Sequence, residues 1–186
     1  DRALFAIKTK LDTLEMPGPL EDLRLTLAGL EIDAVDVIGG EYENMVIGSV
    51  VTAERHPNAD RLSLCTVDIG SETLEIVCGA PNVAAGQRVP VALVGARLPG
   101  GMKIKKARIR GIESNGMICS EAELNLSDEQ DGIMILDHDA PVGQPLKTVL
   151  GDPETVLSVD VGANRPDCLA ITGIAREITA ITRGEL

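Results

Sequence analysis

One short segment concentrates positive charge in an otherwise acidic chain. The chain carries 17 Lys and Arg residues against 29 Asp and Glu residues, which gives a net charge of −12. Cationic side chains grouped closely can bind phosphates, because each contact releases counterions that are condensed on a nucleic acid. The five basic residues of the segment 103–110 are Lys103, Lys105, Lys106, Arg108 and Arg110.

The same segment also has an explanation that needs no ligand. It has the length of a strand, but neither of its alternating faces is purely apolar, so burial would require a twist, a bulge or a strand exposed along much of one side. Lys and Arg on an exposed edge strand protect a sheet against aggregation. Composition alone leaves phosphate binding and a solvated edge strand as equal alternatives.

A polar turn between two predicted strands is the second candidate for nucleic-acid contacts. His56 can contact phosphate, and Arg61 can contact a phosphate or a base edge. The alternative is a purely structural turn, shaped by Pro57 and by bonds from the side chains of Asn58 and Asp60 to the backbone.

Cysteine chemistry and metal binding are not favoured. The four cysteines form no CxxC pair, and a zinc site needs closer ligand spacing. Cys119 precedes a predicted helix and would need a base to act as a nucleophile, but neither His56 nor His138 has an evident orienting partner. Free, buried thiols of a cytoplasmic protein are therefore expected. The cysteines are Cys65, Cys78, Cys119 and Cys168.

Short strand-length runs separated by turn residues fill the middle of the chain. Because the only aromatic residues are Phe5 and Tyr42, the core must be aliphatic, and no stacking platform for bases is available. Strands of this length and spacing predict a small β-barrel. Ser120 and Glu123 have the spacing of a capping box and predict a short helix over 120–126. The predicted strands are 45–53, 62–69, 73–78, 88–94 and 103–110.

The flanks combine helix and strand patterns, whereas the middle shows mainly short strands. A helix at 19–30 and a strand at 31–38 are predicted before it, and a strand at 155–161 and a helix at 167–182 after it. Since neither half can bury a core alone, we expect strand 31–38 to pair with strand 155–161. The predicted fold class is therefore α+β with an all-β part. Residues 1–39 plus 152–186 form a split α+β domain, and the barrel of residues 40–151 is inserted into it.

The middle of the chain resembles the oligonucleotide-binding-fold (OB-fold) tRNA-binding domain of synthetase appendages and stand-alone tRNA-binding proteins. The flanks are similar to the N-terminal region of the bacterial phenylalanyl-tRNA synthetase beta-subunit family, through 25–33, 162–169 and 173–177. The resemblance covers residues 19–186, whereas residues 1–18 lack the family's aromatic-rich opening. The barrel motifs that carry it are His56–Leu62, Ile76–Asn82 and Arg110–Ser120.

The resemblance implies a tRNA-binding segment that catalyses nothing by itself. Its parent enzyme would be a cytoplasmic ligase that charges tRNA(Phe) with phenylalanine, uses ATP and Mg²⁺, and combines two alpha and two beta subunits. No cofactor, metal, membrane or DNA is expected for the segment itself. The implied contacts to the tRNA backbone are Lys103, Lys105, Lys106, Arg108 and Arg110, with His56, Asn58 and Arg61 at the rim.

Two alternatives stay open at this point. The acidic balance favours a structural module that packs on other synthetase domains and hardly touches RNA. A stand-alone tRNA-binding protein is the other alternative, although the flanks match the synthetase.

Overall fold

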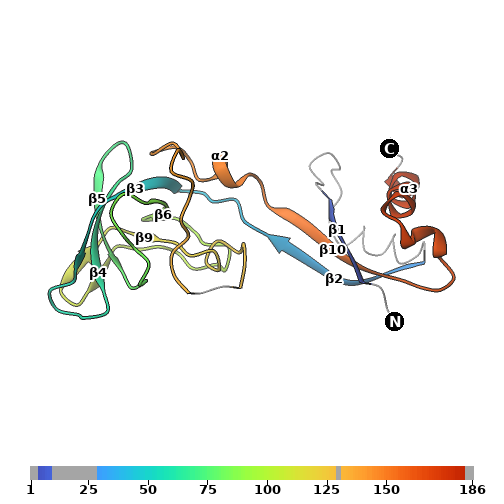
Figure 1. Ribbon diagram of the computed structural model, residues 1–186, viewed down its shortest axis with the longest axis horizontal. Helices are drawn as coiled ribbons and strands as arrows, with labels where there is room; N and C mark the ends of the chain where they lie inside the picture. Colours follow the sequence, from blue (N-terminus) through green and yellow to red (C-terminus); the bar gives the residue numbers. More distant parts are fainter. Residues whose placement is uncertain (1–3, 10–28, 129–130, 183–186) are drawn as a thin grey trace. The chain divides into compact units, whose positions relative to one another are not determined.

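The chain forms two compact units, and each is described by itself. The computed structural model describes residues 4–9, 29–128 and 131–182 (Figure 1). One unit combines the residues up to Ile38 with those from Glu154 onward, and the other is Gly39–Pro153. The second unit is a β-barrel of the OB type inserted between the two halves of a small α+β unit, which confirms the predicted fold class.

Five antiparallel strands build the barrel sheet in the order β5-β4-β3-β6-β9 (Figure 1). Each of the first four predicted strands is present, with boundaries that agree to within two residues. Alternating burial, as in β4 and β5, explains why these runs form strands with one face on the core. The strands are β3 (Met45–Arg55), β4 (Ser63–Asp68), β5 (Thr73–Cys78), β6 (Arg88–Leu93) and β9 (Gly116–Ile118).

The long strand β3 and one serine close the sheet on itself. The first half of β3 pairs with β6 and the second half with β4, with a bulge between Val50 and Thr52 that strengthens the local twist. At the open side, Asn115 N donates to Glu75 O at 2.9 Å. The buried Ser114 Oγ accepts from Val77 N at 3.1 Å, so β5 is held against the segment that leads into β9.

An aliphatic core fills the barrel, as the scarcity of aromatic residues requires. One cluster surrounds Ile47, Leu124 and Leu146, and a second surrounds Val67 and Ile76; all five are fully buried. The single tyrosine, Tyr42, joins the first cluster, and its hydroxyl donates to Leu124 O at 3.2 Å. The barrel thus carries its own hydrophobic core.

The basic segment 103–110 is not one strand, so that prediction is wrong. Only β7 (Ala107–Ile109) is a strand, and it pairs with β8 (Ile112–Ser114) rather than with the barrel sheet. Ile104 turns into the core with 6% exposure, and its N–H donates to Ala96 O at 2.9 Å. Ile104 is buried while the neighbouring lysines stay exposed, and this first half of the segment joins no strand of the barrel sheet.

The predicted helix over 120–126 is also wrong, although its capping box is present. Ser120 N donates to the Glu123 carboxylate at 2.7 Å, and Glu123 N donates to Ser120 Oγ at 3.3 Å. The following residues form only turns, because Asn125 adopts φ 58° and ends the helical course after about one turn. A four-residue helix that was not predicted, α2 (Lys147–Leu150), lies near the end of the barrel unit.

The split unit is built on a three-stranded antiparallel sheet in the order β1-β10-β2 (Figure 1). Its strands are β1 (Leu4–Thr9), β2 (Leu30–Ile38) and β10 (Glu154–Val161). The expected pairing of the two flanks is confirmed, since Glu154 lies opposite Ile38 and Val161 opposite Leu30. Strand β1 was not predicted.

A helix packs on this sheet. The predicted helix over 167–182 is shorter than expected: α3 spans Ile171–Thr182, and the 3-10 turn η1 (Pro166–Leu169) precedes it. The extended Ala170 separates them. Among the described residues of this unit, Leu30, Val159, Cys168 and Ile174 form a buried cluster. Of the predicted helix 19–30, residues 19–28 lie outside the described residues. No helix in the described part of the chain is long and apolar enough to cross a membrane.

Candidate nucleic-acid interface

Two loops far apart in sequence meet at the basic segment. The loop between β3 and β4 carries His56, Asn58 and Arg61, and the hairpin of β7 and β8 carries Arg108 and Arg110. Asn58 Nδ2 donates to Arg110 O at 3.1 Å across 52 residues of sequence. The structure therefore brings the two groups of candidate residues into one region of the barrel unit.

The β7–β8 hairpin turns through Arg110 and Gly111. Both residues have positive φ, 50° and 95°, as in the type I′ turns that suit two-residue hairpins. Arg108 Nε donates to Gly111 O at 3.1 Å and braces the turn from inside the hairpin. Arg110 is exposed at its tip, so its side chain is available to a ligand.

Some cations of this interface form ion pairs with carboxylates, and others do not. Lys106 Nζ lies 2.8 Å from the Glu113 carboxylate, and the bond from Lys106 lowers the pKa of Glu113. Both side chains are more than half exposed, so the pair contributes little to stability. Lys103 and Lys105 are exposed, and the structure gives neither an ion-pair partner within the described ranges.

His56 does not lie at an exposed rim. Its side chain is only 2% exposed, and Nδ1 accepts the Asn58 N–H at 3.1 Å. Its backbone N–H donates to Leu62 O at 2.9 Å. His56 thus bonds within its own turn, an arrangement that neither alternative of the sequence analysis contained.

The other two predicted rim residues are exposed. Asn58 uses its side chain to reach the hairpin rather than its own loop, and Arg61, three residues further on, is exposed to solvent. Asp60 pairs with Arg55 at 2.8 Å instead of bonding the backbone. The cations that can meet a ligand from this loop are therefore Arg61 and the paired, exposed Arg55.

Besides Arg55, the sequence analysis missed a second basic residue. Exposed Arg97 forms an isolated β-bridge with Lys103, so the two backbones lie side by side. The signal was available: the Pro-Gly-Gly turn at 99–101 folds the chain back and places 97 opposite 103.

The cysteines are not part of a reactive site. All four are free and buried, which confirms the prediction for them. Burial raises the pKa of the Cys119 thiol to about 12 and that of Cys65 to about 11, so both thiols are protonated at neutral pH. Nowhere in the described ranges do three or more His, Cys, Asp or Glu side chains group as a metal would require.

A hollow of about 790 Å³ opens on the barrel unit. Its walls include Pro81, Met117 and Glu123, and none of its lining residues is basic. The hollow therefore adds no cation to the candidate nucleic-acid interface.

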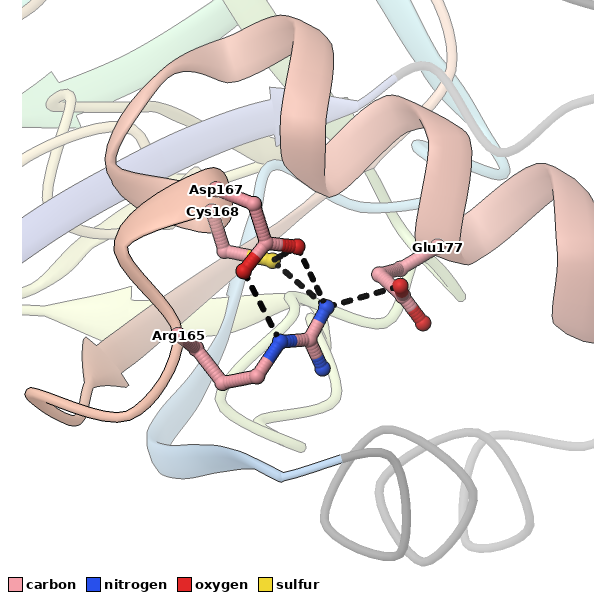
Figure 2. A network of polar contacts seen from close by, with 4 residues as sticks. All are labelled: Arg165, Asp167, Cys168 and Glu177. Carbon is pink, nitrogen blue, oxygen red and sulfur yellow. Dashed lines mark hydrogen bonds and ion pairs between the residues drawn. The ribbon is translucent and has the colours of Figure 1, made fainter.

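The split unit holds a separate polar network, shown in Figure 2. The Arg165 guanidinium donates to the Asp167 carboxylate at 2.8 and 3.1 Å and to Glu177 at 2.7 Å. It also donates to the buried Cys168 sulfur at 3.0 Å. The bonds from Arg165 lower the pKa of Asp167 to about 2. Because Glu177 lies on α3, the network ties η1 to that helix and has a structural role.

The architecture and the paired basic loops are those of a tRNA-binding OB-fold domain, and a family comparison agrees. The family model described as "Putative tRNA binding domain" matches residues 45–145, which is more than half of the chain. The chain belongs to this family.

Curated relatives extend the likeness beyond the barrel. The chain is 51% identical over 158 residues to the "Phenylalanine--tRNA ligase beta subunit" of Pseudomonas fluorescens, which covers 85% of the chain and 20% of that protein. It is 49% identical over 176 residues to the same subunit of Syntrophus aciditrophicus, covering 95% and 22%. The chain thus spans about a fifth of the length of these relatives.

Among solved structures, the chain is similar to a "MetRS related protein" from Pyrococcus horikoshii. The TM-score is 0.42 with 24% sequence identity, over 55% of this chain and 87% of that one.

Proposed function

We propose that this chain is the tRNA-binding part of a bacterial phenylalanine–tRNA ligase beta subunit, and that its barrel holds tRNA by the phosphate backbone. The observation that carries the proposal is the family match over 45–145, which contains every basic residue of the candidate interface. The identity to the beta subunits supports the parent enzyme.

The proposed contacts come from exposed cations on the β3–β4 loop, on the segment 103–106 and on the β7–β8 hairpin. Backbone contacts suit this surface, because a shallow face without aromatic residues cannot stack bases, whereas A-form RNA offers phosphates and 2′-hydroxyls. His56 supports the loop from inside rather than touching RNA. The proposed phosphate contacts are Arg61, Lys103, Lys105, Lys106, Arg108 and Arg110.

By the same proposal, the parent enzyme charges tRNA(Phe) with phenylalanine in the cytoplasm. It uses ATP and Mg²⁺ and combines two alpha with two beta subunits. We propose no site for ATP or Mg²⁺ within this chain. The split domain of residues 1–39 plus 152–186 and the tRNA-binding barrel of residues 40–151 would be the two functional domains of this segment.

A second candidate function is a packing module that contacts other parts of the synthetase. The net charge of −12 favours it, because an acidic protein repels RNA outside a local basic surface. The Lys106–Glu113 pair also reduces the positive charge available to RNA.

Alanine substitution separates the two candidates. We expect Lys105→Ala with Arg108→Ala to weaken the binding of the 1–186 chain to bulk tRNA. The slope of log affinity against log salt should fall in magnitude by about 1.5, since each lost phosphate contact contributes about 0.7 to 0.9. Filter binding between 50 and 200 mM salt measures both quantities.

The matched control is Lys147→Ala with Arg176→Ala, which removes one lysine and one arginine outside the interface. This control should keep the wild-type slope. Equal effects of the two double variants would reject specific contacts and favour the packing module.

A further inference from the structure

We infer that Asn58 is a positioning residue that joins Arg61 and Arg110 into one phosphate-binding surface. The Asn58 side chain makes the hydrogen bond that the structure shows between the 56–62 loop and the 110–111 turn. Its Nδ2 donates to Arg110 O at 3.1 Å. The inference rests on the proposed function and adds to it a neutral residue on which the two loops depend.

The loop side of this bond is held firmly. His56 is buried, and its Nδ1 accepts the Asn58 N–H at 3.1 Å, which fixes the Asn58 backbone. The His56 and Leu62 backbones are bonded at 2.9 Å, and this bond closes the loop at its base. Because the backbone of Asn58 is fixed, its short side chain is aimed at the hairpin with little freedom to lose.

The hairpin side of the bond carries backbone strain. Arg110 adopts φ 50°, a region that Gly, Asn and Asp enter more readily than Arg. Residues held in sparsely populated backbone regions persist only where the surroundings fix them, and they cluster at functional sites. Here Asn58 binds the carbonyl of Arg110, while Arg108 binds the carbonyl of Gly111 at 3.1 Å.

Both anchors therefore act on the turn that projects the Arg110 side chain. Without the Asn58 bond, no side-chain hydrogen bond of the described residues would join the loop of Arg61 to the turn of Arg110. A ligand with regularly spaced phosphates would then have to order them as it binds, which weakens binding and loses a simultaneous contact. The Asn58 bond thus holds Arg61 and Arg110 in place before the ligand binds, so the ligand does not have to order them.

The test is the salt dependence of tRNA binding by Asn58→Ala in the 1–186 chain. We expect affinity for bulk tRNA at 50 mM salt to fall about three- to tenfold. The slope of log affinity against log salt should fall in magnitude by about one, as if a cation had been removed. A neutral side chain that touches RNA directly would change affinity without changing this slope.

The matched control is Asn82→Ala. Asn82 ties another pair of loops of the same barrel, because its amide donates to Ile133 O and accepts from Ile133 N, both at 2.9 Å. Asn82 and Ile133 are both uncharged. The Asn82→Ala variant should therefore lose stability and keep the wild-type salt slope. A double-mutant cycle adds Arg110→Ala to Asn58→Ala, and the second substitution should then cost less than it does alone.

Several results would overturn the inference. Wild-type affinity and slope for Asn58→Ala would do so, and so would a weakened affinity with an unchanged slope. If Lys105→Ala with Arg108→Ala still weakens binding in that case, the proposed function survives without the positioning role. If the wild-type chain does not bind tRNA at 50 mM salt, both fall. Should Asn58→Ala unfold the barrel, Asn58→Ser is measured in its place with the same expectations.

Discussion

The barrel and the split unit bury apolar side chains in different ways. Barrel strands pair mostly with neighbours that are close in sequence, such as β3 with β4 and β4 with β5, around two large aliphatic clusters. In the split unit, β2 pairs with β10 across the whole inserted barrel, and the described cluster has four fully or nearly buried members.

This difference has a consequence for stability and function. The barrel can fold around its own core, whereas the split unit must close a loop of more than 100 residues before its central strand is paired. The ends of the insertion ease that closure, because Val46 near its start bridges to Pro145 near its end. We therefore expect that damage to the split unit leaves the barrel folded.

The largest expected effect comes from cavities placed in each core. Leu124→Ala in the barrel and Ile174→Ala on α3 should each lower the free energy of unfolding of their own unit by about 2 to 5 kcal/mol. Tyr42, which bonds to Leu124 O, is the only tyrosine, and its fluorescence reports on the barrel. The circular dichroism signal at 222 nm includes α3.

Only Leu124→Ala should reduce tRNA binding in step with barrel unfolding. A single unfolding transition that is the same in both probes and is shifted equally by the two variants would contradict separate unfolding of the two units.

A middle-sized effect is expected from the capping box of the barrel. Ser120→Ala removes the hydroxyl that accepts from Glu123 N, and it should cost about 1 kcal/mol of barrel stability. Urea unfolding followed by Tyr42 fluorescence measures the change. Thr is the matched replacement, because Ser120→Thr keeps the hydroxyl and should restore most of the loss; failure of that rescue would remove the capping explanation.

The smallest effect concerns acid stability of the split unit. The bonds from Arg165 lower the pKa of Asp167 to about 2, below the value near 4 of an unfolded aspartate. The contribution of Asp167 is therefore fully present above pH 4 and is lost as the pH falls toward 2.

Asp167→Asn should flatten this part of the pH profile in thermal unfolding followed at 222 nm. Asp139→Asn, an exposed position of the barrel unit, serves as the control and should leave the profile unchanged. If Asp167→Asn loses as much thermal stability between pH 4 and pH 2 as the wild type does, the Arg165 network does not govern the acid stability of this unit.

Sequence patterns predicted the parts of the fold that depend on local periodicity. Strand β5 matches its prediction at both ends, and the pairing of β2 with β10 followed from the inability of either flank to bury a core alone. The basic segment could not be predicted in the same way. Its single apolar residue in the first half, Ile104, is used by the core, and the chain then leaves the barrel sheet for a hairpin.

The candidate interface was predictable in its charges but not in its arrangement. The cluster Lys103–Arg110 is visible in the sequence, yet the bond from Asn58 to Arg110 joins residues that are 52 positions apart. The sequence presents His56 as a polar turn residue, but the structure buries it, and its Nδ1 accepts the Asn58 N–H. Long-range bonds of single side chains leave no period for sequence reasoning to detect.

The most direct test of the account is the binding of the purified 1–186 chain to bulk tRNA between 50 and 200 mM salt. If the six proposed cations of the candidate interface contact phosphates, binding should be measurable at 50 mM salt. It should then weaken with a slope of about −4 in log affinity against log salt, as expected for five to six phosphate contacts. Absence of binding at 50 mM salt, or binding that does not change with salt, would contradict the assignment of the barrel as a phosphate-binding surface.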